Sequence, residues 1–257
     1  MSPLLISAGV LVVVCLAGWW RQTITRNAGH VDVIWTFGVG GAGLFYLLLM
    51  PADGDVLHRL LAALLIGVWS VRLGTHIWRR VHGAEEEGRY RAIREHFGDR
   101  VNVFHLFFFL SQGLLAWLFA LPHWLLSGHP GGGDVFLWLG FAVGASALMG
   151  EALADHQLQQ FRANPANKGK TCRNGLWRYS RHPNYFFEWL HWFSYPIMAI
   201  GANGAQWLWL APLMMFLFLW FVTGIPYTER QALKSRGEDY RDYQRSTSVF
   251  IPWRPKR

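Results

Sequence analysis

The sequence predicts an all-α membrane protein with about seven transmembrane helices in a single domain over residues 1–257, its N-terminus periplasmic and its C-terminus cytoplasmic. Two observations predict this class. Hydrophobic residues make up 52% of the chain and occur in long uninterrupted blocks rather than in alternation, so they need lipid around them. Basic residues gather in every second connection between these blocks, which gives the expected orientation.

The apolar blocks are close to the length of about 20 residues that crosses a bilayer core at 1.5 Å per residue. They lie at residues 3–20, 31–50, 57–78, 102–126, 135–154, 185–201 and 206–226. We expect the first block to be a retained helix, because it lacks the basic start and the cleavage site of a signal peptide. The polar segments 79–101, 155–184 and 227–257 are expected to form structured loops and amphipathic helices.

Most of the 24 Lys and Arg residues follow the first, third, fifth and seventh blocks. The alternate connections are short and nearly uncharged, as at residues 51–56 and 128–134. The positive-inside rule therefore places the basic segments, and any chemistry, on the cytoplasmic side. Two explanations fit these basic residues: attraction to lipid headgroups, and binding of an anionic ligand. We expect no nucleic-acid partner and no obligate protein partner.

The chain offers little of its own for metal or redox chemistry. Its two cysteines, Cys15 and Cys172, cannot build a disulfide framework or a thiolate metal site. Its 11 histidines are scattered, and we predict no metal. Redox chemistry would therefore need a borrowed cofactor.

A glycine pattern at residues 38–43, Gly-Val-Gly-Gly-Ala-Gly, fits the dinucleotide-binding fingerprint by spacing alone. No strand precedes it, and it lies inside an apolar block. Small residues at this spacing allow membrane helices to approach closely, so we interpret the pattern as helix packing.

Ionisable side chains inside the apolar blocks indicate a polar interior, because each is costly in lipid unless it faces protein or water. Glu151 and Asp155 are four residues apart and share one helix face. Glu188 and His191 share another face in the same way. The remaining members of this group are Asp32, Arg72 and His76. Two interpretations are open. The group forms a functional site, or its members form interhelical ion pairs, such as one between Asp32 and Arg72.

The densest polar motif, Gly-Leu-Trp-Arg-Tyr-Ser-Arg-His-Pro-Asn-Tyr at residues 175–185, joins a basic loop to an apolar block. Pro183 suits a first helical turn, where exposed amide groups together with Arg178, Arg181 and His182 can hold phosphate oxygens. The alternative is an interfacial anchor, since Arg, Tyr and Trp also gather at membrane surfaces.

Four motifs together resemble the carboxyl-terminal domain of the steroid 5α-reductase family, and more narrowly its bacterial DUF1295 branch. They are E-x-x-x-D-x-Q-x-x-x-F at residues 151–161, G-L-W-R-Y-x-R-H-P-N-Y-x-x-E at 175–188, G-I-P-x-x-E at 224–229, and Y-R-D-Y-x-R-x-T-S-x-F-I-P-W at 240–253. The resemblance covers about residues 30–257 and is densest after residue 150. Membrane methyltransferases that act on isoprenylcysteine or phospholipid share only the Arg-His-Pro-x-Tyr string.

The resemblance implies an enzyme of the bacterial inner membrane that binds NADPH and reduces a carbon–carbon double bond conjugated to a carbonyl, in a steroid-like or isoprenoid-like substrate from the bilayer. The cofactor-binding candidates are Arg72, Glu151, Asp155, Arg162, Arg178, Arg181, His182, Asn184, Tyr185, Glu188, Glu229, Tyr240 and Tyr243. Guanidinium groups match the phosphates of NADPH, and a carboxylate such as Asp155 accepts hydrogen bonds from ribose hydroxyls.

Reduction of an enone also needs a hydrogen-bond donor at the substrate carbonyl. Family members use a glutamate and a tyrosine, and here Asp32 falls near the first position and Trp69 near the second. We take Asp32 as the catalytic candidate, since a desolvated carboxyl group can donate as the neutral acid. An indole nitrogen donates one hydrogen bond but cannot transfer a proton.

Two other functions are consistent with the residues. The first is an S-adenosylmethionine-dependent methyltransferase of the isoprenylcysteine or phospholipid type. The second is a non-catalytic lipid-binding protein in which the polar residues serve only the fold.

Overall fold

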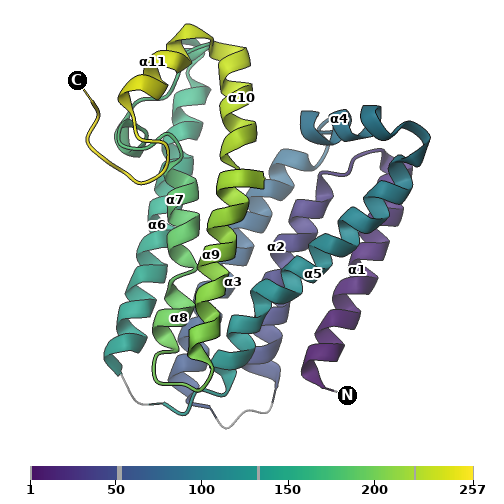
Figure 1. Ribbon diagram of the computed structural model, residues 1–257, viewed down its shortest axis with the longest axis vertical. Helices are drawn as coiled ribbons and strands as arrows, with labels where there is room; N and C mark the ends of the chain where they lie inside the picture. Colours follow the sequence, from purple (N-terminus) through teal and green to yellow (C-terminus); the bar gives the residue numbers. More distant parts are fainter. Residues whose placement is uncertain (1, 51–53, 132–133, 223, 257) are drawn as a thin grey trace. The chain divides into compact units, whose positions relative to one another are not determined.

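The computed structural model describes residues 2–50, 54–131, 134–222 and 224–256, and every regular element in these segments is a helix (Figure 1). The chain divides into two compact units, Met1–Gly132 and Gly133–Arg257. Six helical segments in the described residues are long and apolar enough to cross a membrane: Pro3–Thr25, His30–Leu49, Val56–Val81, Gly88–Ser127, Val135–Ala163 and Ala205–Arg236. The chain is therefore an all-helical, multi-pass membrane protein.

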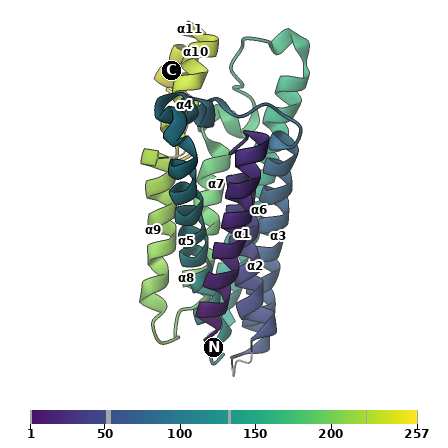
Figure 2. The same ribbon diagram turned by 90° about the vertical axis from the view of Figure 1, so that its right-hand side faces the viewer.

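The described residues of the first unit form a bundle of four long helices and one short one. These are α1 (Pro3–Thr25), α2 (His30–Leu44) with a π-helical extension η1 (Phe45–Leu49), α3 (Val56–Val81), α4 (Gly88–Phe97) and α5 (Val101–Ser127), the last two joined by the 3₁₀ turn η2 (Gly98–Arg100). Helix α2 packs on α1, α3 and α5, and α1 packs on α5 (Figure 2).

Local sequence explains how α3 begins and ends. Asp55 caps its N-terminus, with its carboxylate accepting a hydrogen bond from the His58 amide at 2.9 Å. Arg79 and Arg80 occupy its last turn, where a positive charge interacts favourably with the negative end of the helix dipole.

The glycines at residues 38–43 lie inside α2, as the helix-packing interpretation predicted. A Cβ atom at Gly38 would lie 2.8 Å from Cδ2 of Leu11 in α1, and one at Gly43 would lie 3.1 Å from the His123 ring in α5. These glycines therefore let α2 approach its neighbours closely.

The second unit contains α6 (Asp134–Ala163), α7 (Pro183–His191), α8 (Ser194–Met198), α9 (Leu210–Leu217), α10 (Ile225–Arg236) and α11 (Glu238–Ser246). The shorter turns η3 (Pro165–Asn167), η4 (Gly175–Arg178), η5 (Ala205–Trp209) and η6 (Phe218–Val222) connect them. Helix α6 packs along α7 and α8. A Cβ atom at Gly140 would lie only 2.6 Å from the carbonyl oxygen of Ser194, so glycine is needed where α6 meets α8.

The predicted apolar block at 185–201 is not one long helix. It folds as α7 and α8, which are separated at Trp192 and Phe193, and neither reaches the length of a span. Pro196 explains the break, because a proline cannot donate to the carbonyl four residues earlier and its ring crowds that carbonyl. The described residues thus confirm six of the predicted spans, and the count of seven is not confirmed.

Candidate functional site

The end of α6 beyond its apolar part carries the first candidate residues of the second unit. Asp155 accepts a hydrogen bond from the Asn184 side-chain amide at 3.1 Å, and Oδ1 of Asn184 accepts one from the Tyr185 backbone amide at 3.0 Å. Asn184 is the second residue of α7, which begins at Pro183 as the sequence predicted. The structure therefore brings together three of the predicted cofactor-binding residues.

A basic cavity of about 590 Å³ lies further along the same helix. Asp155, Leu158 and Arg162 follow one another at spacings of three and four residues, so they share a face of α6. The cavity is lined by Leu158, Phe161, Arg162, Asn164, Pro165, Asn167, Lys168, Gly169, Lys170, Cys172, Ser235 and Arg236. Four of these side chains are cationic and none is acidic. We refer to this cavity, between the ends of α6 and α10, as the cationic cavity.

Only Arg162 of these four cations was among the predicted site residues. Lys168 and Lys170 follow the helix end in a short loop, and Arg236 lies at the end of α10. No sequence pattern indicates that residues some 70 positions apart share a cavity. The high density of basic residues in 162–181 was the signal that could have identified the lysines. The structure adds these three residues to the candidate site.

Gln157 holds the start of the densest motif against α6. Its side-chain oxygen accepts a hydrogen bond from the Leu176 amide at 2.9 Å, and the Trp177 indole donates to the Ala154 carbonyl at 2.9 Å. Gly175 adopts a positive φ of 57°, and a Cβ atom there would collide with the Gln157 amide. The glutamine of the predicted motif thus orients the loop that leads to Asn184.

Glu229 is the centre of a buried network in this unit. Its carboxylate lies 2.9 Å from Nε of Arg181 and 3.0 Å from Nε2 of His182, and it accepts a hydrogen bond from the Tyr240 hydroxyl at 3.0 Å. The Gln244 side chain also donates to it. Burial lowers the pKa of His182, although the Glu229 charge acts in the opposite direction. Burial and the same charge raise the pKa of Tyr240 well above its ordinary value.

The same network ties the C-terminal segment to the motif loop. The Tyr243 hydroxyl donates to the carbonyl oxygens of Trp177 and Ser180, the latter at 3.0 Å. The Arg181 amide donates to the Ser248 carbonyl at 2.8 Å, and the Arg181 side chain donates to the Gln244 carbonyl at 2.8 Å. Arg181, Tyr240 and Tyr243 therefore contact protein groups, which gives each a clear part in the fold.

The other predicted residues of this unit divide by exposure. Glu151 and Glu188 are buried on α6 and α7, and the Trp192 indole donates to Glu188 at 3.0 Å. Arg178 is exposed. The rings of His182 and Tyr185 stack in parallel, with 5.4 Å between their centroids.

In the first unit, Asp32 sits in a polar cluster at the start of α2. It pairs with Arg89, and the Tyr90 hydroxyl donates to its carboxylate at 3.1 Å. Arg89 also lies 3.2 Å from Glu87. We refer to Asp32, Arg89 and Tyr90 as the Asp32 cluster. The ion pair that the sequence suggested for Asp32 was with Arg72, which is half-buried on α3.

Trp69 is fully buried and packs edge-on against Trp35, with 5.8 Å between the ring centroids. In the sequence, Trp69 falls near the position of the family's tyrosine. In the structure, a tyrosine of α4, Tyr90, lies beside Asp32. Residues 32 and 90 are far apart in the chain, so no local pattern could have joined them.

Comparisons with known proteins identify a family and a relative of this chain. A family model described as a protein of unknown function, DUF1295, matches residues 18–247. An uncharacterized protein of Schizosaccharomyces pombe is 25% identical over 259 aligned residues, which cover 91% of this chain and 75% of the relative. No solved structure matches the chain.

Proposed function

The chain belongs to the DUF1295 family, and from this premise we propose that it is an NADPH-dependent reductase of the steroid 5α-reductase type, acting on an enone double bond in a lipophilic substrate. The DUF1295 description assigns no activity, so the proposal stands on the site. The observation that carries it is the cationic cavity beside the Asp155 and Asn184 pair.

The cationic cavity suits a nucleotide with several phosphates. Arg162, Lys168, Lys170 and Arg236 bring four positive charges to one space of about 590 Å³. Guanidinium groups bind phosphate oxygens in pairs of parallel hydrogen bonds, and ammonium groups bind them as point charges. NADPH carries a pyrophosphate and an additional 2′-phosphate, so this charge supports NADPH over NADH.

Asp155 would hold a ribose of the nucleotide. A carboxylate accepts hydrogen bonds from ribose hydroxyls, and the Asn184 amide holds Asp155 in place at 3.1 Å. Asp155 lies one turn before Leu158 and two turns before Arg162 on the same face of α6. A ribose at Asp155 would therefore have its phosphates directed along α6 toward the cavity.

Bound NADPH would supply the hydride for the β carbon of the enone. The protein must then stabilise the enolate oxygen and provide a proton at the α carbon. In the Asp32 cluster the Tyr90 hydroxyl and the Arg89 guanidinium are donors of the kind that an enolate oxygen requires. Asp32 would orient both donors through the contacts that it makes with them.

The remaining features of the proposal concern the membrane. A seventh span would be formed by α7 and α8 together, which begin at Pro183 and end at Met198. The basic connections would face the cytoplasm, with the N-terminus outside, in a bacterial inner membrane.

NADPH consumption by the purified protein with a panel of lipophilic enones tests the reaction. We expect oxidation of NADPH that depends on the enone and falls strongly in Asp32→Asn and in Tyr90→Phe. Arg91→Ala is the matched control, because Arg91 is exposed and pairs with the exposed Glu85. Methyl transfer from S-adenosylmethionine to a lipid, or binding of lipid with no turnover of NADPH, would refute the reductase and support the corresponding alternative.

A further inference from the structure

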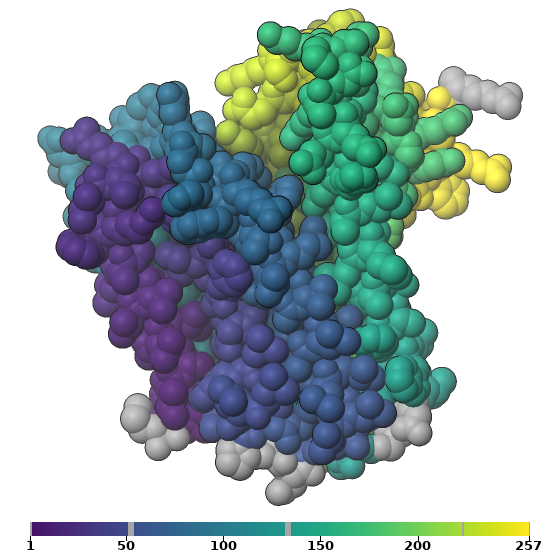
Figure 3. Space-filling model, turned by 180° about the vertical axis from the view of Figure 1, so that it is seen from behind, coloured from purple at the N-terminus to yellow at the C-terminus, as the bar shows by residue number. Residues whose placement is uncertain are grey.

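The C-terminal segment, residues 248–256, carries an exposed apolar surface that has no part in the proposed reductase site. Ile251 and Trp253 are 57% and 73% exposed. Tyr179 of the motif loop, which is also exposed, lies beside them, because its carbonyl accepts a hydrogen bond from the Trp253 amide at 2.9 Å. Figure 3 shows the C-terminal residues, yellow, projecting from the surface of the second unit. We refer to Tyr179, Ile251 and Trp253 as the C-terminal patch.

The fold holds this segment in place. The Ser180 hydroxyl donates to the Phe250 carbonyl at 2.7 Å. The Phe250 ring is buried, with its centroid 5.5 Å from that of Trp189 in α7 and 6.0 Å from that of Trp220 in η6. The apolar side chains of the C-terminal patch are therefore kept at the surface by a segment that is fixed on both sides.

The C-terminal patch lies at the level where the apolar part of α6 ends. A bilayer core of about 30 Å takes about 20 helical residues, so a span that begins at Val135 ends near Ala154. The next three residues, Asp-His-Gln at 155–157, are polar. The Trp177 indole donates to the Ala154 carbonyl at 2.9 Å, and Tyr179 follows two residues later. The C-terminal patch thus meets the boundary between hydrocarbon and headgroups.

The last candidate span, Ala205–Arg236, gives the same depth. About 20 residues from Ala205 reach Gly224, and Trp220, on which Phe250 packs, lies about one turn before that point. Since Ile251 directly follows Phe250, the segment emerges from the protein close to the bilayer surface.

The residues around the C-terminal patch are basic. Arg178 and Arg254, each next to an aromatic residue of the patch in the chain, are exposed, and Arg178 is outside the lining of the cationic cavity. Residues 175–181 and 248–256 include no Asp or Glu. The acidic side chains of α11 pair with arginines: Glu238 with Arg241 and Arg245, Asp239 with Arg173, and Asp242 with Arg245. Aromatic residues with neighbouring cations are typical of the headgroup layer of a membrane with anionic lipid.

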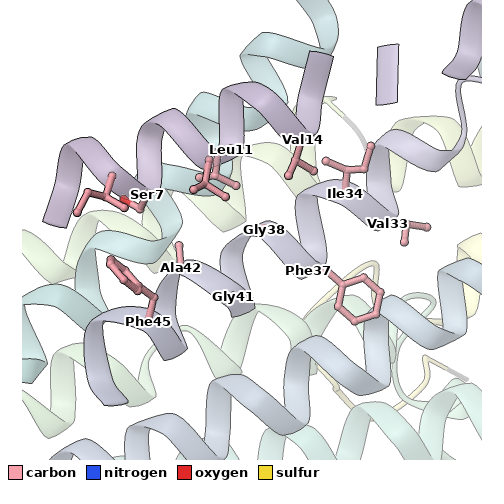
Figure 4. Close-up of a pocket in the computed structure, with 12 residues that line it drawn as sticks. Ser7, Leu11, Val14, Val33, Ile34, Phe37, Gly38, Gly41, Ala42 and Phe45 are labelled. Atoms are coloured by element: carbon pink, nitrogen blue, oxygen red, sulfur yellow. The ribbon is translucent and has the colours of Figure 1, made fainter. Parts of the chain in front are cut away.

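An apolar groove of about 410 Å³ between α1 and α2 offers a contrast within the same chain. Figure 4 shows the side chains that line it, and among these described residues only Ser7 has a polar side chain. No charged group lines this groove, so nothing in its lining selects one occupant. The C-terminal patch combines apolar and basic residues, and this combination selects the headgroup layer.

We propose that residues 248–256 form a membrane-surface anchor, with the C-terminal patch in the headgroup layer and with Arg178 and Arg254 on the phosphate groups of anionic phospholipids. The anchor holds the motif loop at the bilayer surface, because the two segments are hydrogen-bonded to each other. It needs no nucleotide and no turnover, so it stands or fails separately from the reductase proposal.

Quenching of a fluorophore by nitroxide lipids measures the depth of the C-terminal patch. Ile251→Cys carries the fluorophore NBD in a background of Cys15→Ala and Cys172→Ala, and it leaves Trp253 and both arginines in place. In phosphatidylcholine vesicles we expect a nitroxide on the headgroup to quench this label more than a nitroxide midway along the acyl chain. Val13→Cys, on an exposed position within α1, is the reference for chain depth, and Arg241→Cys, on the exposed side of α11, is the reference for water.

The same label tests the recognition of charge. Phosphatidylglycerol should quench it more than phosphatidylcholine that carries the same nitroxide at the same mole fraction. This preference should fall by about fivefold in Arg178→Ala and in Arg254→Ala, which is the contribution of one basic residue near an anionic surface. Arg241→Ala is the matched control, because Arg241 is exposed but pairs with Glu238, and it should keep the preference. A thermal melt checks that each variant is folded.

Three results would overturn the proposal. Quenching at residue 251 that equals the Arg241→Cys reference would place the segment in water. Quenching that equals the Val13→Cys reference would place it in hydrocarbon instead of among headgroups. Equal quenching by the two lipids, or an unchanged preference in the folded Arg178→Ala and Arg254→Ala variants, would remove the role of the arginines.

Discussion

Replacing Glu229 by alanine should destabilise the second unit more than any surface change of the same type. The Glu229 carboxylate forms an ion pair with Arg181 and accepts hydrogen bonds from His182, Tyr240 and Gln244. It thereby joins α10, α11 and the motif loop. The side chains of Glu229 and Arg181 are 13% and 8% exposed. The substitution leaves the Arg181 charge buried without its carboxylate.

The size of the effect follows from these contacts. Removing one partner of a buried ion pair costs about 3–5 kcal/mol, because the remaining charge stays desolvated. Arg181 keeps its hydrogen bond to the Gln244 carbonyl at 2.8 Å, which favours the lower end of this range. The lost bonds from Tyr240 and Gln244 add to the cost but are coupled to the first term. We expect a loss of about 3–5 kcal/mol and a fall in Tm of about 6–20 °C.

Thermal unfolding of the purified protein in detergent measures this change. Glu238→Ala is the matched control, because Glu238 is 62% exposed and pairs with the exposed Arg241 and Arg245. Exposed pairs of this kind contribute at most about 1 kcal/mol. If Glu229→Ala lowers Tm no more than Glu238→Ala does, the network is not a structural centre and the reasoning is refuted.

Three further outcomes follow from single contacts. Gly140→Ala should cost about 1–3 kcal/mol in thermal unfolding, because its Cβ would press on the Ser194 carbonyl at 2.6 Å. Gly175→Ala should also destabilise the fold, by about 1–2 kcal/mol or more, since it adds a positive-φ residue and a clash with Gln157. Burial acts to raise the pKa of Asp239, but hydrogen bonds from Thr171 and nearby arginines outweigh it and lower the pKa below 3.8. The stability from Asp239 is therefore full above about pH 4 and lost as pH falls through the lowered pKa, a decline that Asp239→Asn should remove.

Controls for the two glycine changes come from the same chain. Gly41→Ala places its Cβ in open space and should leave Tm almost unchanged, in contrast to Gly140→Ala. Gly83→Ala adds a positive-φ residue, at 75°, with no neighbour within 4 Å, so it carries the backbone strain of Gly175→Ala without its clash. Equal melting of Gly140→Ala and Gly41→Ala would contradict the close approach of α6 and α8. For the pH profile, identical curves for wild type and Asp239→Asn below pH 4 would contradict the assigned role of Asp239.

The long spans could be predicted from the sequence because hydropathy and length act locally. The block predicted at 102–126 is found as Val101–Ser127, within one residue at each end. The block predicted at 185–201 failed as a continuous helix, because one proline, Pro196, outweighs the apolar character of its neighbours. Hydropathy measures the affinity of a segment for lipid and carries no information on a missing amide donor.

The sequence motifs predicted individual residues of the candidate site but not the contacts between them. Asp155 and Asn184 were both predicted, for example, but they are 29 residues apart and meet only because α7 packs on α6. Likewise, Arg236 reaches the cationic cavity, and Tyr90 reaches Asp32, only through the packing of helices that are distant in sequence. Glu229 was predicted from its motif, but its contacts to Arg181 and Tyr240 could not be, because they depend on how the C-terminal segment folds back.

Titration calorimetry with NADPH, NADH and S-adenosylmethionine tests the central claim most directly. Arg162→Ala removes one cation of the cationic cavity, and Arg241→Ala removes an exposed arginine of the same unit that does not line it. The account predicts that the wild type binds NADPH more tightly than NADH, that Arg162→Ala weakens NADPH binding by about tenfold or more, and that Arg241→Ala leaves it unchanged. Failure of the folded wild type to bind NADPH, or saturable binding of S-adenosylmethionine in its place, would contradict the account.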